Sequence, residues 1–139
     1  MKKTQKLKMA ELTSRLIGKK YNLGQHDCLS VIIYFCDAWG ITIPDEFEGY
    51  TRENYAELYN KDPEATKEVF IKFISALGKS IDPKRAAAGD FLITEYKKQK
   101  SIFIHGGRGT GISAFTDKEI DVVSLKPYKI LKAYRWRAE

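Results

Sequence analysis

Cys28 is the side chain of this 139-residue chain that could most directly do chemistry. It follows Asp27, a favourable N-cap residue, and would be the first residue of a helix that runs to about Trp39. Because the amide groups at a helix N-terminus carry partial positive charge, they stabilise a thiolate and lower the pKa of a cysteine. Cys28 is thus a candidate nucleophile. The alternative is a buried apolar residue on the same helix stripe as Cys36.

A cysteine nucleophile also needs a base within about 3 Å, or within reach through one water molecule. The chain has two histidines, His26 and His105. His26 lies two residues before Cys28 and could approach the sulfur, although an exposed loop histidine is the simpler interpretation. His105 ends an apolar strand-like run. The sequence leaves both histidines open as alternative bases for Cys28.

The two cysteines do not indicate a disulfide or a metal site. If Cys28 and Cys36 share one helix, about 12 Å separates them, whereas a disulfide requires Cα atoms within roughly 7 Å. Neither histidine is spaced to complete a zinc site with them. We therefore expect no metal and no cofactor, and nothing indicates an oxidising compartment.

Apolar spacing predicts helices in the first half of the chain and strands in the second half. Helices are expected over about 4–18, 27–39, 51–59 and 62–77. Thr51 is expected to cap the helix over 51–59. Strands are expected over 91–93, 101–105, 112–115, 120–125 and 130–136. The glycines between 106 and 111 are typical of a hairpin turn, since a phosphate-binding loop would open a helix. Helices followed by an antiparallel sheet give an α+β fold, and 1–139 is expected to be a single domain.

The formal net charge of +6 comes from lysines and arginines that are spread along the whole chain. Such scattering is typical of solvating charge, and no nucleic-acid-binding motif accompanies it, so we expect no nucleic-acid partner. Asp45, Glu46 and Glu48 form a small acidic cluster beside Pro44, which we interpret as a solvated loop. No apolar run is long enough for a transmembrane segment, and we expect no signal peptide.

The stretch from Gly18 to Cys28 resembles the nucleophile motif of the NlpC-type cell-wall peptidases, which are papain-like cysteine peptidases. That motif has a glycine, a tyrosine, a second glycine and then Asp-Cys at a helix start, and Tyr21 and Gly24 stand at matching positions. The resemblance implies a papain-like α+β fold in which the helix that begins at Cys28 packs against the antiparallel sheet. Tyr21 and Asp27 then belong to the site around the nucleophile.

Three later stretches resemble further landmarks of the same family. Residues 88–93 resemble its Gly-Asp pair followed by an apolar strand, and residues 101–109 resemble the next hairpin, in which an apolar strand runs into Gly-x-Gly. Residues 132–135 resemble the chain end of short members carried by tailed phages. The likeness therefore covers most of the chain, from about Gly18 to Arg137.

The same comparison marks where this chain departs from the family. The family's base is a histidine at the start of the strand after Gly-Asp, and the matching residue here is Ser101. The residue that orients the base matches Ser113, and Leu29 and Ser30 replace the family's Ser-Gly after the cysteine. Because a serine hydroxyl does not accept a proton near neutral pH, the set of Cys28, Ser101 and Ser113 has no base.

We therefore expect a catalytically degenerate domain, a pseudoenzyme that serves as a structural or assembly component of a phage tail tip. The expected partners are phage tail proteins or bacterial peptidoglycan, and the expected location is the virion tail or the host cytoplasm during assembly. The alternative is an active cysteine peptidase that cleaves peptidoglycan stem peptides with Cys28 as nucleophile. That alternative needs an unusual base, either His26 or, in a register slipped by four residues, His105.

Overall fold

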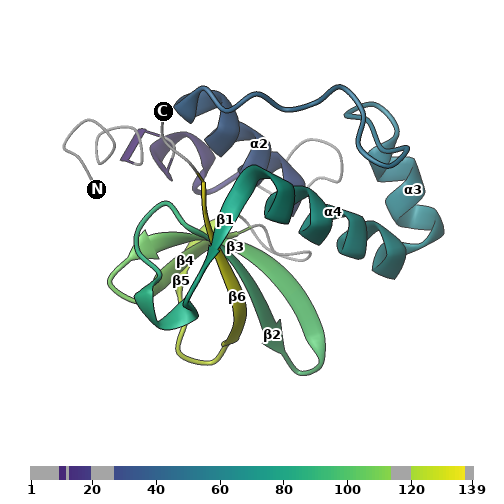
Figure 1. Ribbon diagram of the computed structural model, residues 1–139. Helices are drawn as coiled ribbons and strands as arrows, with labels where there is room; N and C mark the ends of the chain where they lie inside the picture. The colour runs from purple at the N-terminus through teal and green to yellow at the C-terminus, as the bar shows by residue number, and fades with distance from the viewer. Residues whose placement is uncertain (1–9, 12, 20–26, 114–119, 137–139) are drawn as a thin grey trace.

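The computed structural model describes residues 10–11, 13–19, 27–113 and 120–136, and at Cys28 it describes the backbone alone. Residues 10–11 and 13–16 are helical. The later helical elements are α2 (Cys28–Trp39), α3 (Tyr55–Lys61), α4 (Pro63–Leu77) and the 3-10 helix η1 (Pro83–Arg85). The strands are β1 (Gly78–Ile81), β2 (Phe91–Tyr96), β3 (Gln99–Gly107), β4 (Thr110–Ser113), β5 (Asp121–Ser124) and β6 (Lys129–Trp136). The predicted α+β class is confirmed, with α2 and α4 on one side of an antiparallel sheet (Figure 1).

Local signals at both ends of α2 act as the sequence predicts. Asp27 is the N-cap, and its Oδ1 accepts the amide hydrogen of Ser30 at 2.8 Å. Gly40 ends the helix in the left-handed conformation with φ +70°, where a side chain would be strained. Cys28 is therefore the first residue of α2, as expected.

The start of α3 differs from the prediction. The amide of Thr51 donates to Asn54 Oδ1 at 2.7 Å, and the amide of Asn54 donates back to Thr51 Oγ1 at 3.1 Å. This reciprocal pair closes a turn ahead of the helix, and α3 begins at Tyr55 with Asn54 as the N-cap residue. The amide of Tyr55 also donates to the Thr51 carbonyl at 3.1 Å. Thr51 therefore caps the turn that leads into α3, whereas the helix itself begins four residues later than predicted. α4 begins as predicted, with Asp62 as N-cap and Pro63 in the first position.

The six strands follow the order β1-β6-β2-β3-β4-β5, and every neighbouring pair is antiparallel. β6, the last of the described strands, lies between β1 and β2. The sequence does not predict β1, because Gly78–Ile81 contains a single large apolar side chain. The predicted hairpin turn between β3 and β4 is confirmed, and Gly107 and Gly109 have φ values of +92° and +71° there.

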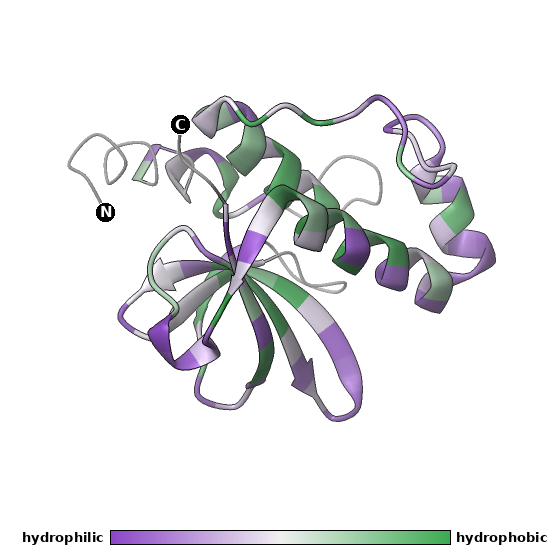
Figure 2. Cartoon of the chain, in the orientation of Figure 1, coloured by the Kyte–Doolittle hydropathy of each residue, from purple (hydrophilic) through white to green (hydrophobic). Residues whose placement is uncertain are grey.

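The sheet separates two sets of buried side chains. The helix-side core joins the sheet to α2 and α4, and it includes Ile102 and Ile104 of β3. The second core lies on the opposite face and includes Phe103 of β3. Its buried members are Leu92, Phe103, Leu125 and Ala133. Figure 2 shows hydrophobic residues along α2 and α4 and in the parts of the strands nearest to them, whereas the far hairpin end is hydrophilic.

Candidate functional site

The start of α2 is held in place by a buried carboxylate next to Cys28. Asp27 is 2% exposed. Its oxygens accept the Ser30 amide hydrogen at 2.8 Å, the Ser30 hydroxyl hydrogen at 3.0 Å and the Tyr55 hydroxyl hydrogen at 2.7 Å. These contacts cap α2 and fasten it to α3. We therefore assign Asp27 the role of a cap that fixes where the first residue of α2 lies.

The two serines at the expected base and orienting positions lie on the sheet face away from α2. Side chains alternate along a strand, so Ser101 lies on the face of Phe103, in the second core, and not on the face of Ile102. Ser113 directly follows Ile112, a member of the helix-side core, and therefore also lies on the opposite face. Its hydroxyl donates to the carbonyl oxygen of Ile102 at 2.8 Å. The structure does not bring Ser101 and Ser113 to the start of α2.

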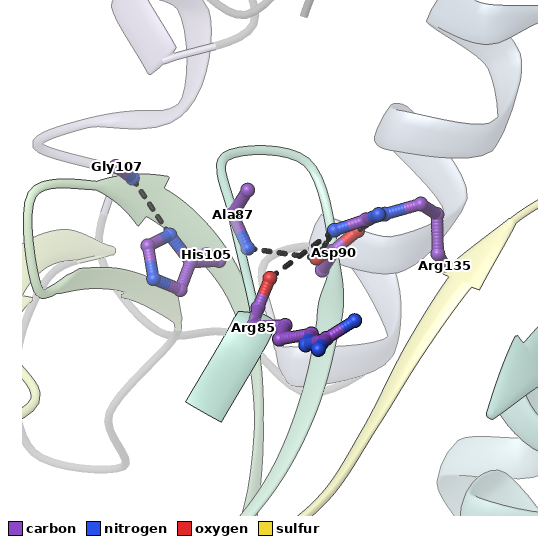
Figure 3. A network of polar contacts seen from close by, with 6 residues as sticks. All are labelled: Arg85, Ala87, Asp90, His105, Gly107 and Arg135. Carbon is purple, nitrogen blue, oxygen red and sulfur yellow. Dashed lines mark hydrogen bonds and ion pairs between the residues drawn. The ribbon is translucent and has the colours of Figure 1, made fainter. Parts of the chain in front are cut away.

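His105 lies two residues after Phe103 on β3, so its side chain is also on the sheet face away from α2. Its Nδ1 accepts the amide hydrogen of Gly107 at 2.9 Å (Figure 3). A nitrogen that accepts carries no proton, so the ring is neutral with its proton on Nε2. Burial lowers the pKa of His105 from its ordinary value, and the negative charge of Asp90 offsets part of this effect. His105 therefore supports the β3–β4 turn and is not brought to α2.

Tyr21 and His26 lie outside the described residues. Their expected places near Cys28 remain predictions.

The Gly-Asp landmark is the centre of a polar network at the start of β2. Asp90, which is 3% exposed, accepts the amide hydrogen of Ala87 at 2.8 Å. Arg135 donates to both oxygens of Asp90, from Nε at 3.0 Å and from Nη2 at 2.9 Å, and the same Nη2 donates to the Arg85 carbonyl at 3.3 Å. Figure 3 shows these groups converging on the carboxylate. Two stretches that carry the family resemblance, 88–93 and 132–135, are thus bonded to each other.

Cys36, the other thiol, is unsuited to chemistry. It is fully buried in the helix-side core and forms no disulfide. Burial, helped by the charge of Asp37, raises its pKa to about 12. Because the thiolate is the reactive form, Cys36 is expected to be inert in the folded protein.

Two residues of this region were not predicted as important from the sequence. Tyr55 bonds Asp27 across 28 positions of the chain, and Arg135 bonds Asp90 across 45. No local motif marks Tyr55, since a tyrosine on a short helix is ordinary core. Arg135 lies in an alternating basic and aromatic stretch, but that pattern does not name its partner.

Across the described parts of the chain, no three or more His, Cys, Asp and Glu side chains gather in a way that could hold a metal ion. Among the same residues, no helix combines the length and apolar character needed to cross a membrane. A scan of the chain against protein-family models finds no match, and a search of curated proteins finds no matching sequence.

Proposed function

We propose that this chain is an NlpC-like domain with a papain-like fold that lacks peptidase activity and acts as a structural or assembly component of a phage tail tip. The observation that carries the proposal is the position of Ser101, Ser113 and His105 on the sheet face opposite α2. A cysteine at the start of α2 would need a base within about 3 Å of its sulfur. Within the described residues, no histidine lies on that side of the sheet.

The family part of the proposal is supported by the arrangement of the elements. A helix that begins with cysteine packs on an antiparallel sheet, and the strand that follows Gly89 and Asp90 lies inside that sheet. The resemblance to papain-like peptidases implies this packing. It also implies that residues 101 and 113 lie beside Cys28, and there the described structure departs from it. The tail-tip part rests on the likeness of residues 132–135 to short phage-borne members.

The competing function is an active peptidase that cuts peptidoglycan stem peptides. It draws on one feature, the position of Cys28 as the first residue of a 12-residue helix, where the helix field favours a thiolate. His105 is engaged with Gly107 on the opposite face of the sheet. The competing function therefore depends on His26.

The two functions are separated by incubating purified peptidoglycan with the protein and with its Cys28→Ala variant. Mass spectrometry of the soluble fraction measures released stem peptides. We expect both proteins to release no more than a buffer control. Release by the unchanged protein that disappears in Cys28→Ala, and also in His26→Ala, would establish the peptidase and refute the proposal.

A gain-of-function variant tests the geometric reason. If Ser101 merely replaced a catalytic histidine in an otherwise intact site, Ser101→His would restore some cleavage. Because that side chain lies on the face away from α2, we expect Ser101→His to stay inactive while it remains folded. Restored, Cys28-dependent cleavage would show that the assigned face is wrong. Separately, a tail-tip role predicts that the chain is present in purified phage particles, and its absence from them would contradict that role.

A further inference from the structure

An apolar pocket opens between α2, the connection from α2 to α3, and α4. Ile33 of α2 lines it, together with Phe47 and Tyr50 of the connection and Val69 and Phe73 of α4. The rings of Phe47 and Phe73 meet edge to face at 5.5 Å. A concave, mainly apolar lining of this kind is typical of sites that bind apolar groups.

The polar groups in the pocket wall are directed at other parts of the protein. The Tyr50 hydroxyl is bonded to Thr66 Oγ1 at 3.0 Å. The Tyr55 hydroxyl, from α3, donates to Asp27 at 2.7 Å. The inner surface of the pocket therefore offers mainly apolar atoms, and it suits a bulky aliphatic or aromatic side chain more than a polar ligand.

The connection that borders the pocket is acidic, in contrast to the protein as a whole. The formal net charge of the chain is +6, yet the segment from Asp37 to Glu53 contains five acidic residues and one basic residue, Arg52. Asp45 and Arg52 line the pocket itself, and Arg52 is paired with Asp37 at 3.7 Å. Asp45 and its neighbour Glu46 are exposed. Glu48 is likewise paired with Lys72 of α4 at 3.6 Å. The exposed carboxylates of Asp45 and Glu46 therefore carry the preference of this rim for a positively charged partner.

We infer that the pocket docks a basic segment of a partner protein, which inserts one bulky apolar side chain while its flanking lysines or arginines meet the acidic rim. The inference names the kind of partner for the assembly role proposed above and rests on that role. Burial of the apolar side chain supplies the affinity, and the rim charges select the partner and its orientation. Tyr55 also joins this pocket to the capped start of α2.

Three synthetic peptides test the inference by ¹H–¹⁵N NMR titration at low salt. The first has phenylalanine between two pairs of lysines, the second has alanine in place of phenylalanine, and the third has glutamates in place of the lysines. The phenylalanine-lysine peptide should shift the amide signals of Ile33, Phe47 and Val69, which line the pocket, in a saturable manner. The alanine peptide should bind at least about tenfold more weakly, since it lacks the buried side chain. The glutamate peptide should not saturate.

Two variants with matched controls complete the test. Val69→Trp fills the pocket from its half-buried rim and should abolish saturable binding, whereas Val122→Trp, on exposed β5 and outside the pocket, should not. Asp45→Lys should weaken binding severalfold at low salt and much less at high salt, unlike Asp121→Lys. Equal binding of the phenylalanine and alanine peptides, no binding at all, or binding unchanged in both pocket variants would overturn the inference. Those results would leave the peptidoglycan assay, and with it the proposed loss of activity, unaffected.

Discussion

Replacing Arg135 with methionine removes the guanidinium from Asp90 while it keeps an unbranched apolar stem of similar length. In the native protein Arg135 donates to both carboxylate oxygens, at 3.0 and 2.9 Å. The side chain of Arg135 is 50% exposed, and that of Asp90 is 4% exposed. The substitution therefore leaves a buried carboxylate that keeps the Ala87 amide as a donor but loses its countercharge.

The size of the effect follows from these exposures. A hydrogen bond to a charged group contributes about 1.5–3 kcal/mol, whereas a fully exposed ion pair contributes about 0–1 kcal/mol. Because one partner is buried and the other is half exposed, we expect Arg135→Met to lower the free energy of unfolding by about 2 kcal/mol. For a chain of this length, that corresponds to a fall in Tm of roughly 6 °C. Arg135→Lys keeps the charge but not the two-pronged geometry, and should lose about half as much.

Equilibrium urea unfolding followed by far-UV circular dichroism measures these losses. Arg52→Met is the matched control, because Arg52 makes an ion pair of 3.7 Å with Asp37 in which both side chains are more than half exposed. The control should change the free energy of unfolding by less than about 0.5 kcal/mol. If Arg135→Met behaves like the control, the reasoning that links burial of Asp90 to stability is refuted. A double-mutant cycle with Asp90→Asn then isolates the pairwise contribution.

Three further predictions concern the site and the second core. Because the pKa of His105 is lowered in the folded state, the unfolded chain binds a proton at a higher pH than the folded protein does. The free energy of unfolding should therefore fall as the pH drops below about 6.5. His105→Asn, whose side-chain oxygen can still accept from the Gly107 amide, should flatten that dependence in unfolding measured against pH. Cys36 should resist iodoacetamide in the native protein and react after denaturation, as peptide mapping would show, and native labelling would contradict its burial. Gly111→Ala should destabilise the fold by about 1–3 kcal/mol, since the added Cβ would lie 2.8 Å from a Phe103 ring atom, and an unchanged Tm would refute this close packing.

The elements that the sequence predicts well are those with local signals. The extent of α2 follows from Asp27, Gly40 and the apolar stripe between them, and all three are features of one short segment. The start of α4 follows in the same way from Asp62 and Pro63. The class of the fold follows from the change of apolar period after the last helix.

The faces of β3 could not be predicted, and the candidate site depended on them. Ile102, Phe103 and Ile104 are all apolar and all buried, because each face of the sheet has its own core. Without a polar and apolar alternation, nothing in the strand indicates which residues face α2. The side on which Ser101 lies is therefore decided by packing between segments that are distant in the sequence.

The contact between Asp90 and Arg135 was unpredictable for a related reason. Forty-five positions separate the two residues, and each has an ordinary local interpretation, as a turn aspartate and as a basic residue on a closing strand. Strand β1 was missed because its four residues contain one large apolar side chain, and it depends on pairing with β6 for its conformation.

The place of β6 in the sheet has a consequence for synthesis of the protein. Among the described strands, β1 has β6 as its sole neighbour, and β6 also covers one edge of β2. While the ribosome is still translating residues 129–136, the nascent chain holds both of these edges open, and open edges invite pairing with other chains. Closure of the sheet must therefore wait until residues 129–136 have been translated, and a stop codon ahead of Lys129 would leave two strands without that partner.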